Sequence, residues 1–201
     1  MNSPETRLLA AQRFDPQLLL AAQGRCADGH IGVRAVFFDV DGVLTDGSLW
    51  IGEHGEAFKP FHSLDGHGLK LLAQAGITPI ILTGRDSPAV RRRVADLGLS
   101  QAHYGVQDKL AAAQSILNQL QLDWGSVAAM GDDWPDLPVL TRVGFACAPA
   151  QAHVEVRAVV HHVTRCEGGR GAVREMCDLL LMASGRYEHL LNGHLTTLDG
   201  R

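Results

Sequence analysis

The chain has 201 residues, of which 20% are charged, and its formal net charge is −4 at pH 7. This length suits one globular domain with a full hydrophobic core, or such a domain with a modest appendage. The longest basic run, residues 91–93, is too short to form the basic face of a nucleic-acid-binding protein, and no apolar run is long enough to span a bilayer.

The cysteines and the amino terminus indicate a cellular compartment. The four cysteines are scattered without a C-x-x-C spacing, so neither a zinc site nor a redox pair is predicted. Scattered thiols in a chain of this size are typical of a reducing compartment. Charged residues interrupt the apolar residues near the amino terminus, which is not the pattern of a signal peptide. We expect a cytoplasmic protein.

A short helix is predicted within the first 33 residues. Asp15 can cap its first turn, and Pro16 suits the first helical position. Gly24 is a typical residue for ending such a helix after residue 23. No residue of this segment suggests chemistry, so we interpret residues 1–33 as an N-terminal extension that packs against the main domain.

The first predicted strand ends in carboxylates. Residues 35–38 are all apolar, and Asp39, Asp41 and Gly42 follow directly. A short apolar run is typical of a buried parallel strand, and ligands bind at the carboxyl ends of such strands. We therefore expect both aspartates in a cleft, with Gly42 letting the backbone approach a ligand. The Asp-x-Asp-Gly pattern also occurs in turns and calcium loops, so the rest of the chain has to decide.

A β-hairpin is predicted immediately after this strand. Two β-prone runs, residues 48–51 and 56–59, flank the turn-rich segment 52–55. The apolar side chains of this region are more than a lone hairpin should expose, because isolated hairpins are marginal in water. We expect the hairpin of residues 47–60 to pack against a partner, such as another copy of the chain.

Strands and helices alternate through the rest of the chain. The predicted strands are residues 77–82, 103–104, 127–130, 144–147 and 159–163, and the predicted helices are residues 69–75, 88–97, 110–120, 137–142 and 172–182. This alternation favours an α/β fold with a mostly parallel sheet and helices on both faces. We place the main domain at residues 34–183 and a loosely ordered C-terminal tail at residues 184–201.

Polar clusters follow the ends of strands or begin helices at four places. Carboxylate oxygens without nitrogen or sulfur donors suit magnesium, while Thr83, the Gly84 amide and Lys109 can bind a phosphate. A carboxylate nucleophile needs such neutralisation, because two like charges ~4 Å apart repel by roughly 4 kcal/mol at a surface-like dielectric. The clusters are Asp39 with Asp41, then Thr83, then Lys109, then Asp132, Asp133 and Asp136.

This combination resembles the four motifs of the haloacid dehalogenase superfamily of aspartate-nucleophile phosphatases. It most closely resembles the family of 3-deoxy-D-manno-octulosonate 8-phosphate phosphatases, which has no large cap domain. The resemblance covers about residues 31–185, and its motifs are residues 39–47, 82–85, 109, 131–138 and 168–175. It implies a Rossmann-like sheet with the hairpin as a flap after the first strand.

The resemblance also implies the catalytic roles. Asp39 would attack phosphorus and become an aspartyl phosphate. Asp41 would protonate the leaving sugar oxygen and then activate water. Thr83 and Lys109 would bind the phosphoryl group.

By the same resemblance, Mg²⁺ would be the cofactor. The Asp39 carboxylate, the Asp41 backbone carbonyl and the Asp132 carboxylate would be its protein ligands. Asp133 and Asp136 would orient metal-bound waters and Lys109 from behind these ligands.

The substrate contacts implied by the resemblance surround a sugar-acid pocket. Arginine suits the carboxylate that a sugar acid carries in addition to its phosphate. This chain departs from the family pattern at Leu64, where an arginine is common, which puts the exact sugar acid in doubt. Arg170 would act on a neighbouring subunit. The implied contacts are His62, Ser63, Leu64, Asp65, Gly66, Lys70, Arg85, Arg93, Lys109 and Arg170.

The activity implied is that of a phosphoric monoester hydrolase. Its substrate would be 3-deoxy-D-manno-octulosonate 8-phosphate, a precursor in lipopolysaccharide biosynthesis, and its assembly a homotetramer packed through the hairpin. Leu64 keeps an acylneuraminate or other nonulosonate 9-phosphate open as the substrate. A catalytically silent binding module is disfavoured, because every catalytic residue type is present. No nucleic-acid or membrane partner is expected.

Overall fold

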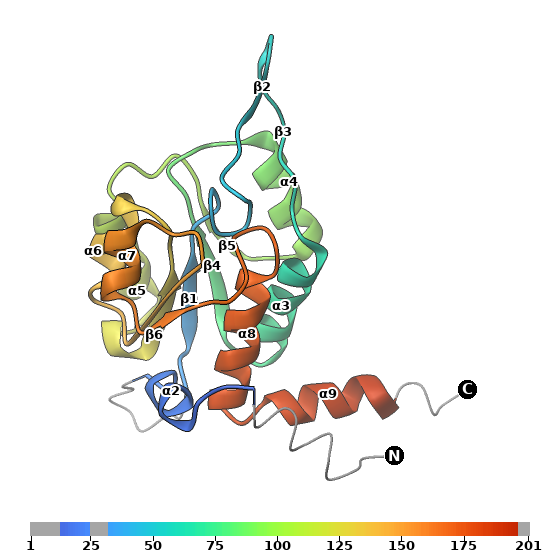
Figure 1. Ribbon diagram of the computed structural model, residues 1–201, viewed down its shortest axis with the longest axis vertical. Helices are drawn as coiled ribbons and strands as arrows, with labels where there is room; N and C mark the ends of the chain where they lie inside the picture. Colours follow the sequence, from blue (N-terminus) through green and yellow to red (C-terminus); the bar gives the residue numbers. More distant parts are fainter. Residues whose placement is uncertain (1–12, 25–31, 197–201) are drawn as a thin grey trace.

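The computed structural model describes residues 13–24 and 32–196, which form a three-layer α/β fold (Figure 1). The central sheet has six strands in the order β5-β4-β1-β6-β7-β8, and every neighbouring pair is parallel. The strands are β1 (Ala35–Phe38), β4 (Thr78–Leu82), β5 (Gln101–His103), β6 (Val127–Met130), β7 (Phe145–Ala148) and β8 (His162–Val163). The predicted α/β class and parallel sheet are confirmed.

Helices cover both faces of the sheet. The helices are α2 (Pro16–Ala21), α3 (Ser63–Gln74), α4 (Pro88–Leu97), α5 (Lys109–Leu120), α6 (Leu137–Leu140), α7 (Val154–Val159), α8 (Ala172–Ala183) and α9 (Tyr187–Thr196), with single 3₁₀ turns η1 (Trp124–Ser126) and η2 (Trp134–Asp136). None of the described helices is long and apolar enough to cross a membrane.

The alternation of side chains along the strands divides the core into two hydrophobic clusters. In β1, Val36 and Phe38 join the cluster under α3, α4 and α8, whereas Ala35 and Phe37 join the cluster under α5, α6 and α7. All four side chains are buried. This explains why β1 is apolar at every position, since neither of its faces meets water.

The chain order creates a switch point beside β1. From β1 the chain proceeds outward to β4 and β5, and then returns to build β6, β7 and β8 on the other side of β1. Crossover connections leaving in opposite directions open a crevice at the carboxyl ends of the strands. Asp39 lies at this point, where its backbone amide donates a hydrogen bond to the Met130 carbonyl (3.1 Å).

The hairpin predicted after β1 is present, and it projects away from the body of the molecule (Figure 1). Its strands are β2 (Trp50–Gly52) and β3 (Gly55–Phe58), which pair antiparallel. The Trp50 and Phe58 rings stack with centroids 5.0 Å apart. Both rings are nevertheless more than half exposed. No cap domain is inserted among the described residues.

Helix α3 begins at Ser63, six residues before the predicted start at residue 69. Gly66 and Gly68 lie inside the helix, where the neighbouring side chains leave little space for a Cβ atom. A Cβ atom on Gly66 would lie 2.3 Å from the Arg93 Nη2 atom, and one on Gly68 would lie 3.1 Å from the Cys177 Sγ atom. The two glycines thus let α3 approach its neighbours closely, so tertiary packing outweighs their low helix propensity.

Two further elements differ from the predictions near the carboxyl end of the chain. The strand predicted at residues 159–163 is reduced to the two residues of β8, because α7 occupies residues 154–159 and buries Val156. Helix α9 forms in the segment expected to be a loosely ordered tail.

The N-terminal helix forms as predicted but ends at Ala21. The Asp15 side chain accepts a hydrogen bond from the Gln17 amide (2.7 Å). Arg13 forms an ion pair with Asp178 of α8 (2.6 Å), which fastens this helix to the main domain. The remainder of the predicted extension, residues 1–12 and 25–31, lies outside the described residues.

Candidate active site

The structure brings the four polar clusters together in one open cleft of about 270 Å³ at the carboxyl ends of β1, β4 and β6. The cleft lies at the switch point of the sheet, where α/β proteins bind ligands. Its lining residues are Asp39, Asp41, Gly47, Thr83, Gly84, Lys109, Asp132, Asp133, Pro135 and Asp136.

Two glycines allow the carboxylates of the cleft to pack so closely. Gly42 has φ +88°, and a Cβ atom on it would lie 2.0 Å from the Asp132 Oδ2 atom. A Cβ atom on Gly131 would lie 2.4 Å from the Cβ atom of Asp136. Any larger residue at either position would displace a carboxylate, so the backbone of both loops is part of the site.

Lys109 lies between two of these carboxylates. Its Nζ atom is 2.8 Å from Asp39 Oδ1 and 2.6 Å from Asp136 Oδ1. Asp108 caps the helix that carries it, accepting a hydrogen bond from the Ala111 amide (2.9 Å). Burial lowers the pKa of Lys109, but the negative charges of Asp39 and Asp136 outweigh burial and raise it overall. The lysine therefore carries a fixed positive charge beside Asp39.

The carboxylates themselves repel one another. Oxygen atoms of Asp39, Asp132 and Asp136 lie within 4.8 Å of one another. Burial, followed by the charges of Asp39, Asp136 and Asp133, raises the pKa of Asp132 to about 8. Burial and the Asp136 charge likewise raise the pKa of Asp39, although Lys109 opposes them. Full ionisation of this cluster requires more positive charge than Lys109 supplies.

A divalent cation with oxygen ligands fits this requirement. One Asp136 oxygen is bonded to Lys109, and the other accepts hydrogen bonds from the amides of Asp132 (3.2 Å) and Asp133 (3.4 Å). Asp39 and Asp132 are therefore the carboxylates of the cluster best placed to face a cation. Oxygen donors of this kind suit Mg²⁺.

Thr83 is held at the end of β4 by its backbone. Its amide donates to the His103 carbonyl (3.0 Å), and its carbonyl accepts from the Val106 amide (3.0 Å). The side chain is buried, and its hydroxyl oxygen accepts a hydrogen bond from the Arg85 amide (3.4 Å). A hydroxyl donor is thus fixed at the edge of the cleft beside Lys109.

Asp41 is held from the hairpin side by a lysine that was not predicted as a functional residue. The Lys59 Nζ atom forms an ion pair with Asp41 Oδ1, while the Arg85 Nε atom lies 3.8 Å from Asp41 Oδ2. Lys59 follows β3 directly and was interpreted as the last residue of a hairpin strand. The available signal was its charge between Phe58 and the apolar residues Pro60 and Phe61.

Gln151, which sequence reasoning missed, acts together with the predicted motif at residues 168–175 to hold the loop that follows β1. The Gln151 side chain donates to the Gly42 carbonyl (2.7 Å) and accepts from the Gly168 amide (2.9 Å). The Gly169 amide donates to the Val43 carbonyl (3.0 Å). A Cβ atom on Gly168 would lie 1.9 Å from the Gly42 oxygen. The glycine motif near α8 therefore packs backbone to backbone on the loop of the two aspartates.

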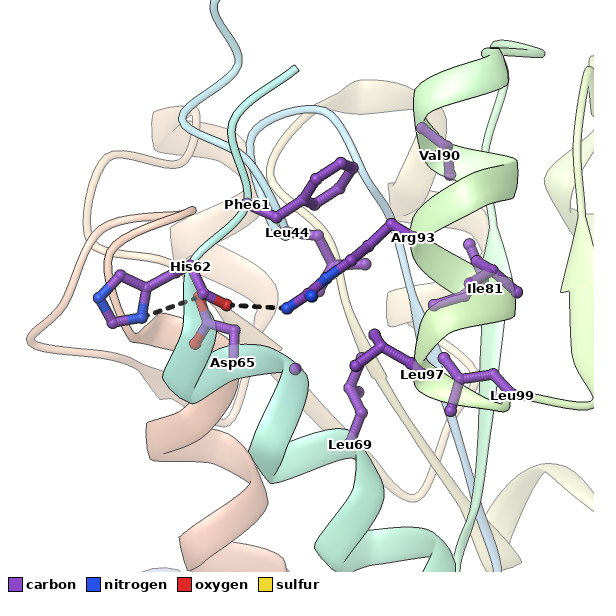
Figure 2. Close-up of a pocket in the computed structure, with 12 residues that line it drawn as sticks. Leu44, Phe61, His62, Asp65, Leu69, Ile81, Val90, Arg93, Leu97 and Leu99 are labelled. Atoms are coloured by element: carbon purple, nitrogen blue, oxygen red, sulfur yellow. Dashed lines mark hydrogen bonds and ion pairs between the residues drawn. The ribbon is translucent and has the colours of Figure 1, made fainter. Parts of the chain in front are cut away.

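Most residues predicted to contact substrate lie elsewhere in this chain. His62, Asp65, Gly66 and Arg93 line a separate pocket between α3 and α4, in which Arg93 reaches toward the His62 carbonyl (3.4 Å) (Figure 2). That pocket has only about 10 Å³ of space, enough for one water molecule. The structure therefore brings none of these four residues into the cleft of the same chain.

Asp65 also has a structural role, and the remaining predicted substrate contacts lie in several places. Asp65 caps α8 by accepting hydrogen bonds from the Gly171 (3.2 Å) and Arg174 (2.8 Å) amides. Leu64 is 52% exposed on the first turn of α3, and Ser63 and Lys70 are also exposed on that helix. The mostly exposed Arg170 lies 4.0 Å from Asp46. Only Arg85 and Lys109 adjoin the carboxylates of the cleft.

Comparisons with known proteins give the same superfamily as the motifs. A model of haloacid dehalogenase-like hydrolases matches residues 102–176. The 3-deoxy-D-manno-octulosonate 8-phosphate phosphatase of Yersinia pestis is 42% identical over 156 residues, which are 78% of this chain and 83% of that protein. The phosphatase of the same name from Haemophilus influenzae is 44% identical over 154 residues, 77% of this chain and 86% of that protein.

A solved structure with the same architecture carries ligands. The 3-deoxy-D-manno-octulosonate 8-phosphate phosphatase of Moraxella catarrhalis, in complex with a magnesium ion, a phosphate ion and a KDO molecule, superposes with a TM-score of 0.81. The two sequences are 33% identical, and the match covers 90% of this chain and 99% of that one.

Proposed function

Because the chain belongs to the 3-deoxy-D-manno-octulosonate 8-phosphate phosphatase family of haloacid dehalogenase-like hydrolases, we propose that it hydrolyses 3-deoxy-D-manno-octulosonate 8-phosphate to the free sugar acid and phosphate. It is a phosphoric monoester hydrolase, and this reaction would place it in lipopolysaccharide precursor synthesis. The observation that carries the proposal is the position of Lys109 between Asp39 and Asp136 in a cleft that also contains Asp41 and Thr83.

Asp39 is the proposed nucleophile. Its carboxylate attacks phosphorus, the bond between phosphorus and the sugar oxygen breaks, and an aspartyl phosphate forms. Lys109 supports this step because its charge offsets the repulsion between a carboxylate and a phosphate dianion. Thr83 donates a hydrogen bond to a phosphoryl oxygen and keeps the group aligned with Asp39.

Asp41 is the proposed proton donor and acceptor. In the first step its carboxyl group gives a proton to the leaving sugar oxygen, and in the second its carboxylate takes a proton from the water that attacks the aspartyl phosphate. Placing the nucleophile two residues from the acid, with Gly42 next, puts both groups on one turn at the mouth of the cleft.

The proposed metal ligands are the Asp39 carboxylate, the Asp41 backbone carbonyl and the Asp132 carboxylate. Mg²⁺ bound there supplies positive charge to the phosphoryl oxygens as charge develops on them. Asp136 accepts hydrogen bonds from Lys109 and from the amides of residues 132 and 133. Asp133 is exposed and lines the cleft, and we propose that it orients water there.

Substrate recognition is proposed to require a second copy of the chain. The cleft is open, and most of the expected sugar contacts, residues 62–66 together with Lys70 and Arg93, are not among the residues that line it in the same chain. Arg170 lies 4.0 Å from Asp46, next to the cleft residue Gly47. In a homotetramer packed through the hairpin, a neighbour can bring these sugar contacts, or its tail, over the cleft and exclude water. Such an enzyme would work in the cytoplasm, where phosphorylated sugars are made.

A nonulosonate 9-phosphate is the second candidate substrate. The observation that favours it is Leu64, whose half-exposed side chain cannot supply the guanidinium that is common at this position in the family. A substrate of different length or substitution would not need that contact.

Kinetics on a panel of phosphorylated sugar acids, with hexose phosphates as controls, tests the proposal. We expect Mg²⁺-dependent phosphate release that is fastest with 3-deoxy-D-manno-octulosonate 8-phosphate. Asp39→Asn should abolish turnover, because an amide cannot form the aspartyl phosphate. A preference for hexose phosphates would overturn the substrate assignment, and turnover that survives Asp39→Asn would overturn the mechanism.

A further inference from the structure

Each aspartate of the Asp39-Val-Asp41 motif has its own buried lysine. Lys109 forms an ion pair with Asp39. Lys59, at the base of the hairpin, forms an ion pair with Asp41. The Lys59 side chain is only 1% exposed, although the hairpin strand that precedes it is exposed almost throughout. A lysine that turns inward from an exposed hairpin is unusual, because lysine is among the residues least often buried.

The burial of Lys59 is balanced by charge. Its ammonium group contacts two carboxylates, Asp41 and Glu56 (3.2 Å to Glu56 Oε2), and Arg85 supplies the second positive charge on the far side of Asp41. Removing one member of a buried pair leaves an uncompensated charge, which is strongly unfavourable. Lys59 and Asp41 are therefore constrained to each other.

Lys59 is itself fixed by a chain of contacts. Glu56 Oε1 accepts a hydrogen bond from the Ser87 hydroxyl. Ser87 is buried and caps α4, accepting from the Val90 amide (3.4 Å). Asp41, Lys59, Glu56 and Ser87 thus form a continuous line from the catalytic loop, through the hairpin, to the first turn of α4.

We propose that Lys59 is a positioning residue that orients the carboxyl group of Asp41 for proton transfer. The inference rests on the proposed function, in which Asp41 protonates the sugar oxygen. Lys59 binds Oδ1, so Oδ2 is left as the oxygen that carries the proton to the leaving group. Lys59 makes and breaks no covalent bond, and acts only through Asp41.

Leaving-group dependence distinguishes this role from general support of the fold, provided that light scattering gives Lys59→Met the same mass as the wild type. The oxygen of a sugar phosphate needs a proton as it leaves, whereas p-nitrophenolate leaves readily without one. The ratio kcat/KM covers the steps up to phosphoryl transfer. Lys59→Met should lower kcat/KM for the sugar-acid phosphate by roughly 100-fold, a typical loss of acid catalysis. Its kcat/KM for p-nitrophenyl phosphate should stay within about threefold of the wild-type value, because that leaving group needs no proton.

Comparing two substrates on one protein sample cancels any loss of folded enzyme. Lys59→Arg, which keeps the charge, should recover much of the kcat/KM for the sugar-acid phosphate. The selective loss of kcat/KM for the sugar-acid phosphate, with little loss for p-nitrophenyl phosphate, is called the substrate discrimination below. Arg157→Met is the control, because Arg157 is exposed on α7, outside both the cleft and the hairpin, and it should change neither substrate's kcat/KM. Equal losses for both substrates in Lys59→Met, or no loss for either, would overturn the positioning role.

The Asp41→Asn variant separates failure of this inference from failure of the proposed function. Asp41→Asn should show the same substrate discrimination, and adding Lys59→Met to it should have no further effect, since coupled residues are not additive. If Asp41→Asn lowers both substrates equally, the acid role of Asp41 is wrong, and the inference falls with it. If only Lys59→Met lacks the discrimination, the inference alone is wrong.

Discussion

Three carboxylates and one lysine at the floor of the cleft form a site that is less stable without its cation than with it. The repulsion between these carboxylates is clearest at Asp132, because burial and its acidic neighbours raise the pKa of Asp132 to about 8. At pH values between 3.8, the ordinary pKa of an aspartate side chain, and about 8, Asp132 keeps its proton in the folded protein, whereas it has released that proton in the unfolded chain. The free energy of unfolding therefore falls as the pH rises through this range.

Asp132→Asn should remove this pH dependence. In the presence of a chelator, variant and wild type should have similar Tm values at pH 5, and the variant should be more stable at pH 8.5, by about 2–4 °C for each kcal/mol of relieved repulsion. Mg²⁺ should raise the Tm of the wild type at pH 8.5 and leave that of Asp132→Asn almost unchanged, because the ligand is lost. Calorimetry at the two pH values measures both effects. A variant less stable than the wild type at pH 8.5 without metal would contradict the argument.

Individual site residues differ in how far the sequence predicts them. Asp39, Asp132 and Lys109 follow apolar runs or begin a helix, so strand ends alone bring them together. Lys59 and Gln151 have no such position: their importance comes from the loops that fold back on residues 41–43. A single sequence carries no signal of those long-range contacts beyond a charge in an apolar run.

At the scale of elements, the loop before α8 supports the loop after β1 that carries Asp39 and Asp41. Gly168 and Gly169 lie against residues 42–45 so closely that no side chain fits between them. Gln151 bonds to both loops at once. The position of Asp39 and Asp41 is therefore set partly by an element that lies more than 120 residues further along the chain.

Gly168→Ala should disturb this packing. A methyl group 1.9 Å from the Gly42 oxygen has to move one of the two loops, and such overpacking typically costs about 1–3 kcal/mol. We expect a lower Tm and a kcat reduced by at least about tenfold, since small misplacements of catalytic groups are costly. Gly193→Ala is the control, because a Cβ atom there meets nothing within 4 Å. Unchanged kinetics in Gly168→Ala would show that the loop does not position the aspartates.

Helices were predicted best where the sequence signals for their start and end lie within or next to the helix itself. Helix α4 was predicted at its observed bounds, because Ser87 and Pro88 start it and Gly98, in the left-handed conformation, ends it. Helix α3 was predicted to begin six residues too late, since glycines that fit against α4 and α8 look like breakers in the sequence. Helix α9 was missed; it contacts α8, and its His194 ring lies 5.7 Å from the His67 ring of α3, long-range contacts that a single sequence does not reveal.

For the whole molecule, the hairpin is the feature that a single chain leaves unexplained. Trp50, Ile51 and Phe58 are 51%, 63% and 56% exposed on a two-stranded ribbon that projects from the body (Figure 1). An exposed apolar ribbon of this kind is typical of an interaction surface. A homotetramer packed through the hairpin would explain why the cleft is open and why most expected sugar contacts lie away from it in a single chain.

Light scattering should therefore give the mass of a tetramer for the wild type and a smaller species for the double variant Trp50→Ser/Phe58→Ser. Each large side chain that is buried on assembly contributes about 1.5–3 kcal/mol, so losing both should weaken association by at least about 100-fold. Activity on the sugar-acid phosphate should fall with it as the neighbour's contacts are lost. Leu20→Ser is the matched control, because Leu20 is 68% exposed on α2, away from the hairpin. A wild type that is monomeric and fully active would remove the role of the hairpin and require the sugar site to be complete within one chain.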